Sequence, residues 1–277
     1  FPSCSQPPCP TSEFLPPELE REIFELAYRC NPMDGLNLKL VAQRVRVWID
    51  ILVYETVKLT TNNGATKFLE AARQKDPVFF TAVKKLSLTY DVSPTQAVEI
   101  VSLCPAVEQL ACWVRQNDSP QLPLLIRQLP LCCLSIERKH FANILAASAL
   151  EYLPWINLTH LELVIWNKDE DELRFTQQLV QELRKLPRLT HIAFPICAQP
   201  VRVDLITSGL PNLAVVILIV ATETEVSDEY SGGVVQISEE SLPVEWEVYH
   251  SEEGNIWARA ERALAARQAA AKEAAKD

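Results

Sequence analysis

The chain has 277 residues, of which 48% are hydrophobic, and its 26 Lys and Arg stand against 36 Asp and Glu for a formal net charge of −10. This length and apolar content predict one elongated domain with a substantial core and a small additional module. The acidic balance disfavours binding to the phosphate backbone of nucleic acids. No apolar run approaches the roughly 18 residues of a membrane span, so we expect no membrane partner.

The start of the chain is rich in proline, serine and cysteine, which predicts a flexible tail over residues 1–13. This tail lacks the apolar core of a signal peptide, although a signal removed earlier is left open. The eight cysteines contain no CxxC pair and no Cys/His spacing typical of a zinc site, and most lie at apolar positions, as buried thiols do. We therefore expect a cytoplasmic protein, with the nucleus as the alternative, and no metal or cofactor.

Residues 14–59 are predicted to form a helical module, because apolar residues recur there at helical spacing. The first stretch contains Leu15, Leu19, Ile23, Phe24 and Leu26, and the second contains Leu38, Val41, Val45, Trp48, Ile49 and Leu52. Pro16 and Pro17 suit a first helical turn, where a missing N–H costs no hydrogen bond. The stretch Asn31–Gly35 is expected to end the first helix.

Four segments of this module closely resemble the F-box-like domain of a large family of proteins from mushroom-forming fungi. They are Leu15–Phe24 (LPPELEREIF), Leu40–Trp48 (LVAQRVRVW), Leu52–Tyr54 and Val57–Leu59. The resemblance implies docking onto the Skp-type adaptor of a cullin ubiquitin ligase, with Leu15, Pro16, Leu19, Ile23 and Phe24 facing the adaptor. The alternative is a helical cap for the next domain, in which Leu19 and Ile23 are buried within the chain.

Short runs of alternating apolar residues recur after a predicted rigid joint over residues 60–83, which contains a helix at Lys67–Lys75. The predicted strands are 84–90, 108–114, 132–137, 159–166, 190–195 and 214–220. Their second inward positions are Leu88, Cys112, Ile136, Leu163, Phe194 and Leu218, separated by 24, 24, 27, 31 and 24 residues. This period is typical of leucine-rich-repeat architecture, in which stacked units bury one another's apolar faces.

Helical patterns fill the gaps between these strands, at residues 94–103, 122–129, 141–153, 171–186 and 203–210, and prolines end most of them. Between Ala221 and Ala258 there are ten carboxylates and no Lys or Arg, which predicts an acidic loop over 221–241. Val244–Tyr249 is a candidate terminal strand, and residues 255–277 are predicted to form a capping helix. These loose repeats and the closing segment Asn255–Glu261 also resemble the fungal family.

The predicted fold class is therefore α/β, an irregular leucine-rich-repeat solenoid over residues 84–254 with parallel strands and outer helices. The strand phase places two Thr-His pairs at equivalent positions on neighbouring strands, with His160 and His191 about 5 Å apart. Seven residues are predicted to form a concave ligand-binding face: Lys85, Gln109, Trp113, Glu137, His160, Glu162 and His191. The histidines are interpreted foremost as solvated residues entering each strand, with ligand binding, a metal site with Glu162, or acid–base chemistry as alternatives.

The sequence contains no phosphate-binding glycine loop, GxSxG elbow or HExxH helix. We therefore expect no catalytic residues. The resemblance to the fungal family implies a non-catalytic substrate receptor of a ubiquitin ligase, with a Skp-type adaptor and a target protein of unknown identity as partners. The alternatives are a stand-alone repeat module with a degenerate F-box as its cap, and an enzyme that uses the paired histidines.

Overall fold

The chain folds into two compact units, whose boundary in the sequence falls between Glu55 and Thr56. The computed structural model describes residues 15–115, 119–146, 155–164, 177–195, 210, 212–221, 233–239 and 255–274. The predicted tail over residues 1–13, the candidate strand Val244–Tyr249 and the predicted helix at 203–210, apart from Leu210, lie outside these residues. Each unit is described by itself.

The described part of the first unit consists of helices. They are α1 (Pro17–Cys30), α2 (Pro32–Gly35), the 3-10 helix η1 (Leu36–Leu40) and α3 (Gln43–Glu55). Pro17 occupies the first helical position of α1, and the carboxylates of Glu18 and Glu20 in the first turn favour the positive end of the helix dipole. The Asn31 side chain accepts a hydrogen bond from the Asp34 backbone N–H and so caps α2.

Helices α1 and α3 are joined by a two-pronged ion pair. Arg44 Nε and Nη2 donate to the two oxygens of the Glu20 carboxylate at 2.9 and 2.7 Å, a geometry that fixes orientation as well as charge. Gly35 lies so close to Tyr28 that an added Cβ would meet that ring at 2.8 Å. Val45 and Ile49 of α3 are fully buried, whereas no residue of α1 is.

The second unit is built on one eight-stranded sheet in which every strand is parallel to its neighbours and strand order follows chain order. The strands are β1 (Thr56–Leu59), β2 (Lys85–Leu88), β3 (Gln109–Cys112), β4 (Cys133–Glu137), β5 (His160–Val164), β6 (His191–Pro195), β7 (Val215–Ala221) and β8 (Val234–Glu239). The mixed α/β class and the parallel sheet are therefore confirmed. Strands β2 to β7 coincide with the six predicted strands to within a few residues.

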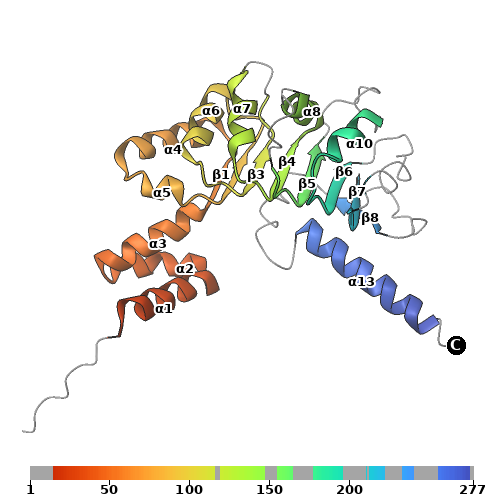
Figure 1. Ribbon diagram of the computed structural model, residues 1–277. Helices are drawn as coiled ribbons and strands as arrows, with labels where there is room; N and C mark the ends of the chain where they lie inside the picture. The colour runs from red at the N-terminus through yellow and green to blue at the C-terminus, as the bar shows by residue number, and fades with distance from the viewer. Residues whose placement is uncertain are drawn as a thin grey trace, which may run out of the picture. The chain divides into compact units, whose positions relative to one another are not determined.

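Helices connect the strands and gather along one side of the sheet, as Figure 1 shows for α4, α6, α7, α8 and α10. Among the described residues, the helices after the first unit are α4 (Asn62–Gln74), α5 (Val78–Thr81), α6 (Pro94–Leu103), α7 (Gln121–Gln128), α8 (Arg138–Ala146), α10 (Gln177–Leu183) and α13 (Ile256–Ala274). None of the helices in the described ranges combines the length and the apolarity that crossing a membrane requires.

The predicted internal row of apolar residues lines up across the sheet. The register pairs Leu88 with Cys112, Cys112 with Ile136, Ile136 with Leu163, and Phe194 with Leu218. All six side chains are at most 2% exposed. A short strand cannot bury its own apolar face, so this shared row is what makes the neighbouring strands mutually dependent.

Two strands lie where the sequence predicted something else. Thr56–Leu59, assigned to the helical module, forms β1 and pairs with β2, because the alternation of Val57 and Leu59 buries both side chains against the sheet. Val234–Glu239 falls within the predicted acidic loop, yet it forms β8, with Val234, Val235 and Ile237 buried. The sequence analysis assigned this segment to a loop because carboxylates flank it, although apolar residues recur within it.

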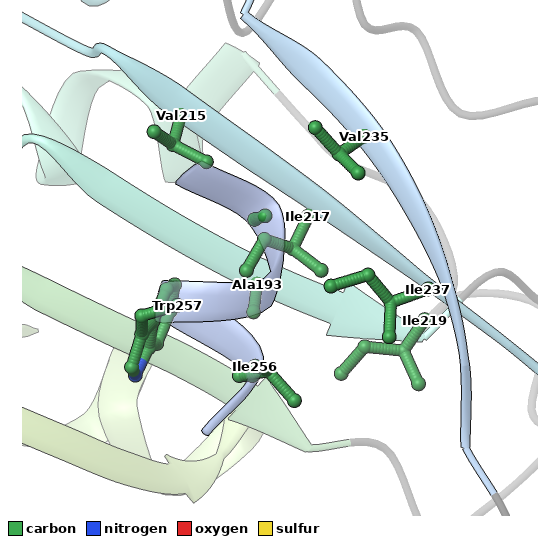
Figure 2. Packing of buried hydrophobic residues seen from close by; sticks show 9 residues of the cluster. Ala193, Val215, Ile217, Ile219, Val235, Ile237, Ile256 and Trp257 are labelled. Atoms are coloured by element: carbon green, nitrogen blue, oxygen red, sulfur yellow. The ribbon is translucent and has the colours of Figure 1, made fainter. Parts of the chain in front are cut away.

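Helix α13 covers the other side of the sheet from the connecting helices, over β6 to β8 (Figure 1). Its first turn inserts Ile256 and Trp257 into the sheet face, where Figure 2 shows them among apolar side chains of those strands. This cluster comprises Ala193, Val215, Ile217, Ile219, Val235, Ile237, Ile256, Trp257 and Ala260. Further along α13, Arg267 Nη1 donates to the Val234 carbonyl at 2.7 Å.

Candidate functional site

The outer face of α1 carries an exposed apolar stripe formed by Leu15, which precedes the helix, and by Leu19, Ile23 and Leu26. Leu19 is 48% and Ile23 is 55% exposed. Pro16 is exposed as well, and Phe24 is half-buried on the flank of the stripe. Large apolar side chains that cluster on a surface mark contact sites for other molecules more often than scattered ones do.

Further apolar side chains of the first unit are exposed beyond those that the sequence predicted for adaptor contact. They are Met33, Leu36, Leu40, Val41 and Val47, and Leu40 is the most exposed at 85%. Val41, which the sequence analysis grouped with the apolar residues of the second helical stretch, precedes α3, because that helix begins only at Gln43. Which of these apolar side chains are exposed depends on the residue at which each helix begins, and the sequence predicts helix starts only approximately.

The paired histidines lie side by side on the face of the sheet opposite the connecting helices. The register aligns His160 with His191, and their rings stack with centroids 4.2 Å apart. The Trp257 ring of α13 meets both edge-on, at 5.1 and 5.9 Å. His191 Nε2 lies 3.2 Å from Glu261 Oε1. The histidines therefore pack against α13, and the interpretation of the pair as solvated is wrong for His191, which is buried, whereas His160 is partly exposed.

Burial under α13 keeps both imidazoles neutral near pH 7. It lowers the pKa of His160 to about 4, with a further contribution from the neighbouring His191. It also lowers the pKa of His191, although the Glu261 carboxylate opposes that shift. Two neutral rings can stack without charge repulsion, so the pair suits recognition and packing better than proton transfer at neutral pH.

We expect the free energy of unfolding to fall as the pH drops from about 6.5 to 4. His160 and the buried His140 each have a pKa of about 4 in the fold. In this window the unfolded chain therefore binds more protons, which favours it. The loss should be about 1–2 kcal/mol per histidine after allowing for partial exposure. Urea denaturation across this range measures it.

The variants His160→Gln and His140→Gln serve as controls for the pH dependence, because glutamine does not titrate. Each should flatten the pH dependence of stability relative to the wild type while leaving the effect of the carboxylates in place. A wild type and a double variant with the same slope between pH 6.5 and 4.5 would contradict the assignment.

Besides His191, three predicted residues of the concave face are buried rather than exposed. Trp113 is 1% exposed and donates from Nε1 to Ser135 Oγ at 2.8 Å, so it is no exposed interface anchor. Glu137 is buried, and its carboxylate oxygens lie 2.8 Å from Lys139 Nζ and 3.1 Å from His140 Nδ1. The third, Glu162, is 1% exposed. The open seven-residue face is thus wrong as a surface, because four of its seven side chains are buried.

Three members of that face line a cavity of about 370 Å³ between the sheet and α13. Lys85, Gln109 and His160 contribute from the first positions of β2, β3 and β5, and their role in binding stays a prediction. Sequence reasoning missed most of the other lining residues, which are Cys132, Cys133, Thr159, Asn255, Trp257, Ala258 and Glu261. The Asn255–Glu261 resemblance gave a closing helix but not its position over the strands.

Across the described ranges, no three His, Cys, Asp or Glu side chains are arranged to hold a metal ion. The sequence alternative of a metal site at His160, His191 and Glu162 therefore finds no support in this part of the chain. The comparisons with protein-family models and with curated proteins found no match for this chain.

Proposed function

We propose that the chain is a non-catalytic protein-binding subunit whose first unit docks onto a Skp-type adaptor of a cullin ubiquitin ligase. The observation that carries this proposal is the exposed apolar stripe of α1. Leu19 and Ile23 are about half exposed, so neither side chain belongs to the core of the first unit. The resemblance of Leu15–Phe24 to fungal F-box-like domains supplies the class of partner.

The second unit is proposed to be an irregular leucine-rich-repeat solenoid that recruits the target protein. The sequential order of the parallel strands and the shared apolar row support this interpretation. In this proposal, the protein acts in the cytoplasm or nucleus, with the α1 stripe contacting the adaptor through Leu15, Pro16, Leu19, Ile23 and Phe24. No residue of this chain takes part in ubiquitin transfer.

The proposal is tested by co-expressing the chain with a Skp-type adaptor from a mushroom-forming fungus and measuring co-purification and affinity. Leu19→Asp and Ile23→Asp should each weaken binding at least tenfold, about 1.4 kcal/mol, because each places a charge in a desolvated contact. Both side chains are exposed in the free chain, so stability should change little.

The matched control is Leu124→Asp, which changes an equally exposed leucine on α7 in the second unit. It should leave adaptor affinity unchanged. A wild-type chain that does not bind the adaptor at micromolar concentration overturns the proposal. Equal weakening by all three variants would place the contact elsewhere and overturn the assignment to α1.

A further inference from the structure

The cavity between the sheet and α13 extends across the starts of several strands. It is lined by the first residues of β2, β3, β4 and β5 and by residues at the start of α13. Its volume of about 370 Å³ falls within the range of ligand sites. The cavity lies within the second unit, so what it binds does not depend on the proposed adaptor docking.

The hydrogen bonds of Thr159 determine which nitrogen of the His160 imidazole carries the proton. Thr159 Oγ1 donates its single hydrogen to the Cys132 carbonyl at 3.0 Å, so it can only accept a hydrogen bond from His160 Nδ1, 2.8 Å away. The other nitrogen of a neutral imidazole is then an acceptor. His160 Nε2 therefore presents a lone pair, and no described residue donates to it.

The neighbouring His191 repeats this arrangement. Thr190 Oγ1 donates to the Thr159 carbonyl at 3.3 Å and accepts from His191 Nδ1 at 2.8 Å. The two histidine rings stack nearly parallel, so both Nε2 lone pairs are turned the same way. His191 Nε2 lies 3.2 Å from Glu261 Oε1, which brings two acceptors together while the imidazole is neutral. This end of the cavity thus gathers acceptors without a donor from the described residues, and an ammonium group supplies three N–H donors.

The charges around the cavity are divided between its two ends. At the end near β5 and β6, Glu261 lines the cavity, and Glu162 of β5 raises the pKa of a lining thiol on β4. At the β2 end, Lys85 lines the cavity and forms no ion pair with the described residues. Glu108 also lies at that end, but Lys84 Nζ contacts its carboxylate at 2.6 Å. A ligand with two opposite charges therefore complements the cavity better than a net anion does.

The separation of the two ends limits the length of such a ligand. Strands β2 and β5 are three strand spacings apart, about 14 Å, and a hydrogen bond at each end takes up about 2.9 Å. Roughly 8 Å is then left between the ammonium nitrogen and the carboxylate, close to the length of two extended residues. Gln109 of β3 lies between the ends, and its amide forms no hydrogen bond with the described residues.

We propose that this cavity binds a linear zwitterion with a primary ammonium group at one end and a carboxylate at the other. The ammonium group donates to His160 Nε2 and to the Glu261 carboxylate, and the ligand's carboxylate accepts from Lys85 Nζ. The chain between them crosses the starts of β3 and β4 in the strand-to-strand direction, beside the Gln109 amide. ω-Amino acids and short peptides share this chemistry. Binding involves no covalent step.

The test is calorimetry on the full chain with two zwitterions, 6-aminohexanoate and glycylglycine, and two singly charged analogues, pentylamine and hexanoate. At least one zwitterion should bind at least tenfold more tightly than either analogue. Tighter binding of glycylglycine identifies a peptide as the ligand, and tighter binding of 6-aminohexanoate identifies an ω-amino acid; both results support the proposal. An analogue that binds as tightly as the better zwitterion, or no binding of either zwitterion at millimolar concentration, would overturn it.

Two variants test the two ends separately. Lys85→Met should weaken the better zwitterion at least tenfold without weakening pentylamine, and Glu261→Gln should weaken it at least tenfold without weakening hexanoate. The matched controls are Lys84→Met, since Lys84 pairs with Glu108 and does not line the cavity, and Glu273→Gln on the exposed part of α13. Both controls should bind as the wild type does. Equal weakening by a control and its matched variant would contradict the assignment of that end.

The acceptor at the ammonium end is tested by a ¹H–¹⁵N spectrum of the imidazoles, assigned with His160→Gln. In the free chain at pH 7, His160 Nδ1 should carry the proton, and the Nε2 signal should shift when the better zwitterion is added. A proton on Nε2 in the free chain would make that nitrogen a donor and would rule out the ammonium contact. An Nε2 signal that stays unchanged under saturation would rule it out as well.

Discussion

Replacing Trp257 with alanine is expected to lower the free energy of unfolding by about 3–5 kcal/mol. The indole of Trp257 is 6% exposed and packs with Ile256 and Ala260 against the apolar faces of β6 to β8. It also meets the rings of His160 and His191 edge-on. Removing it deletes a side chain of α13 that contacts both histidines and that Figure 2 shows beside Ile256 in the apolar cluster. Urea denaturation followed by circular dichroism measures the change.

The matched control for this variant is Gln268→Ala, on the exposed part of the same helix. Its stability should stay within about 0.5 kcal/mol of the wild type, because exposed helical substitutions contribute little. Hydrogen exchange separates two ways in which Trp257→Ala can act. Exchange that accelerates in α13 alone indicates detachment of the helix, and acceleration in β6 to β8 as well indicates loss of the shared core. A loss below 1 kcal/mol would contradict the packing role.

Replacing Trp113 with alanine should cost a similar 3–5 kcal/mol, for a different reason. Trp113 follows β3 and packs with Ala111 and Val164 as a small cluster of its own. Its Nε1 donates to the buried Ser135 Oγ at 2.8 Å. Alanine therefore leaves both a cavity and a buried hydroxyl without its donor. Thermal and chemical denaturation should agree on the loss.

A graded series separates packing from hydrogen bonding at Trp113. Trp113→Phe keeps most of the ring and loses the donor, so it should cost about 1–2 kcal/mol. In the Ser135→Ala background that cost should shrink, because no hydroxyl then loses its partner. Arg115→Ala, at an exposed position two residues on, is the control and should be nearly neutral. A phenylalanine variant as unstable as the alanine variant would contradict the separation.

The direction in which the strand side chains face was predictable, because apolar residues alternate with other residues even in these short strands. In six strands, apolar side chains at every second position predicted which residues face the core. The six residues of the predicted internal row are buried accordingly: Leu88, Cys112, Ile136, Leu163, Phe194 and Leu218. The first strand was not predictable in the same way. Glu55 ends α3 and Thr56 begins β1 with no turn residue between them, so the helical pattern appeared to continue.

The start of α4 shows a second limit. The stretch Thr60–Gly64 has the composition of a turn, yet Thr61 is the N-cap of α4, and its hydroxyl accepts a hydrogen bond from Gly64 N at 3.1 Å. Ser, Thr and Asn favour both turns and helix caps, so composition alone does not decide between them. The helix therefore begins five residues before the predicted Lys67.

The candidate site required information that local sequence does not contain. The sequence predicted that four residues lie in one row on the same face of the sheet, because they occupy equivalent positions in their strands: Lys85, Gln109, His160 and His191. Its exposure depends on α13, which returns 70 residues after His191 to place Glu261 against it. Likewise, alternation put Trp113 on the correct side of the sheet but did not show that its ring folds over Ser135. Long-range packing decides which polar residues reach solvent.

The strict chain order of the sheet has a consequence for how the protein is made. Every strand pairs only with strands adjacent to it in sequence, so each pairing closes only the connection between two consecutive strands, which is fast compared with pairing over long separations. During synthesis on the ribosome, β1 to β7 can assemble in order as they emerge. The docking of α13 is the late step, because Trp257 must return to strands completed long before it leaves the exit tunnel.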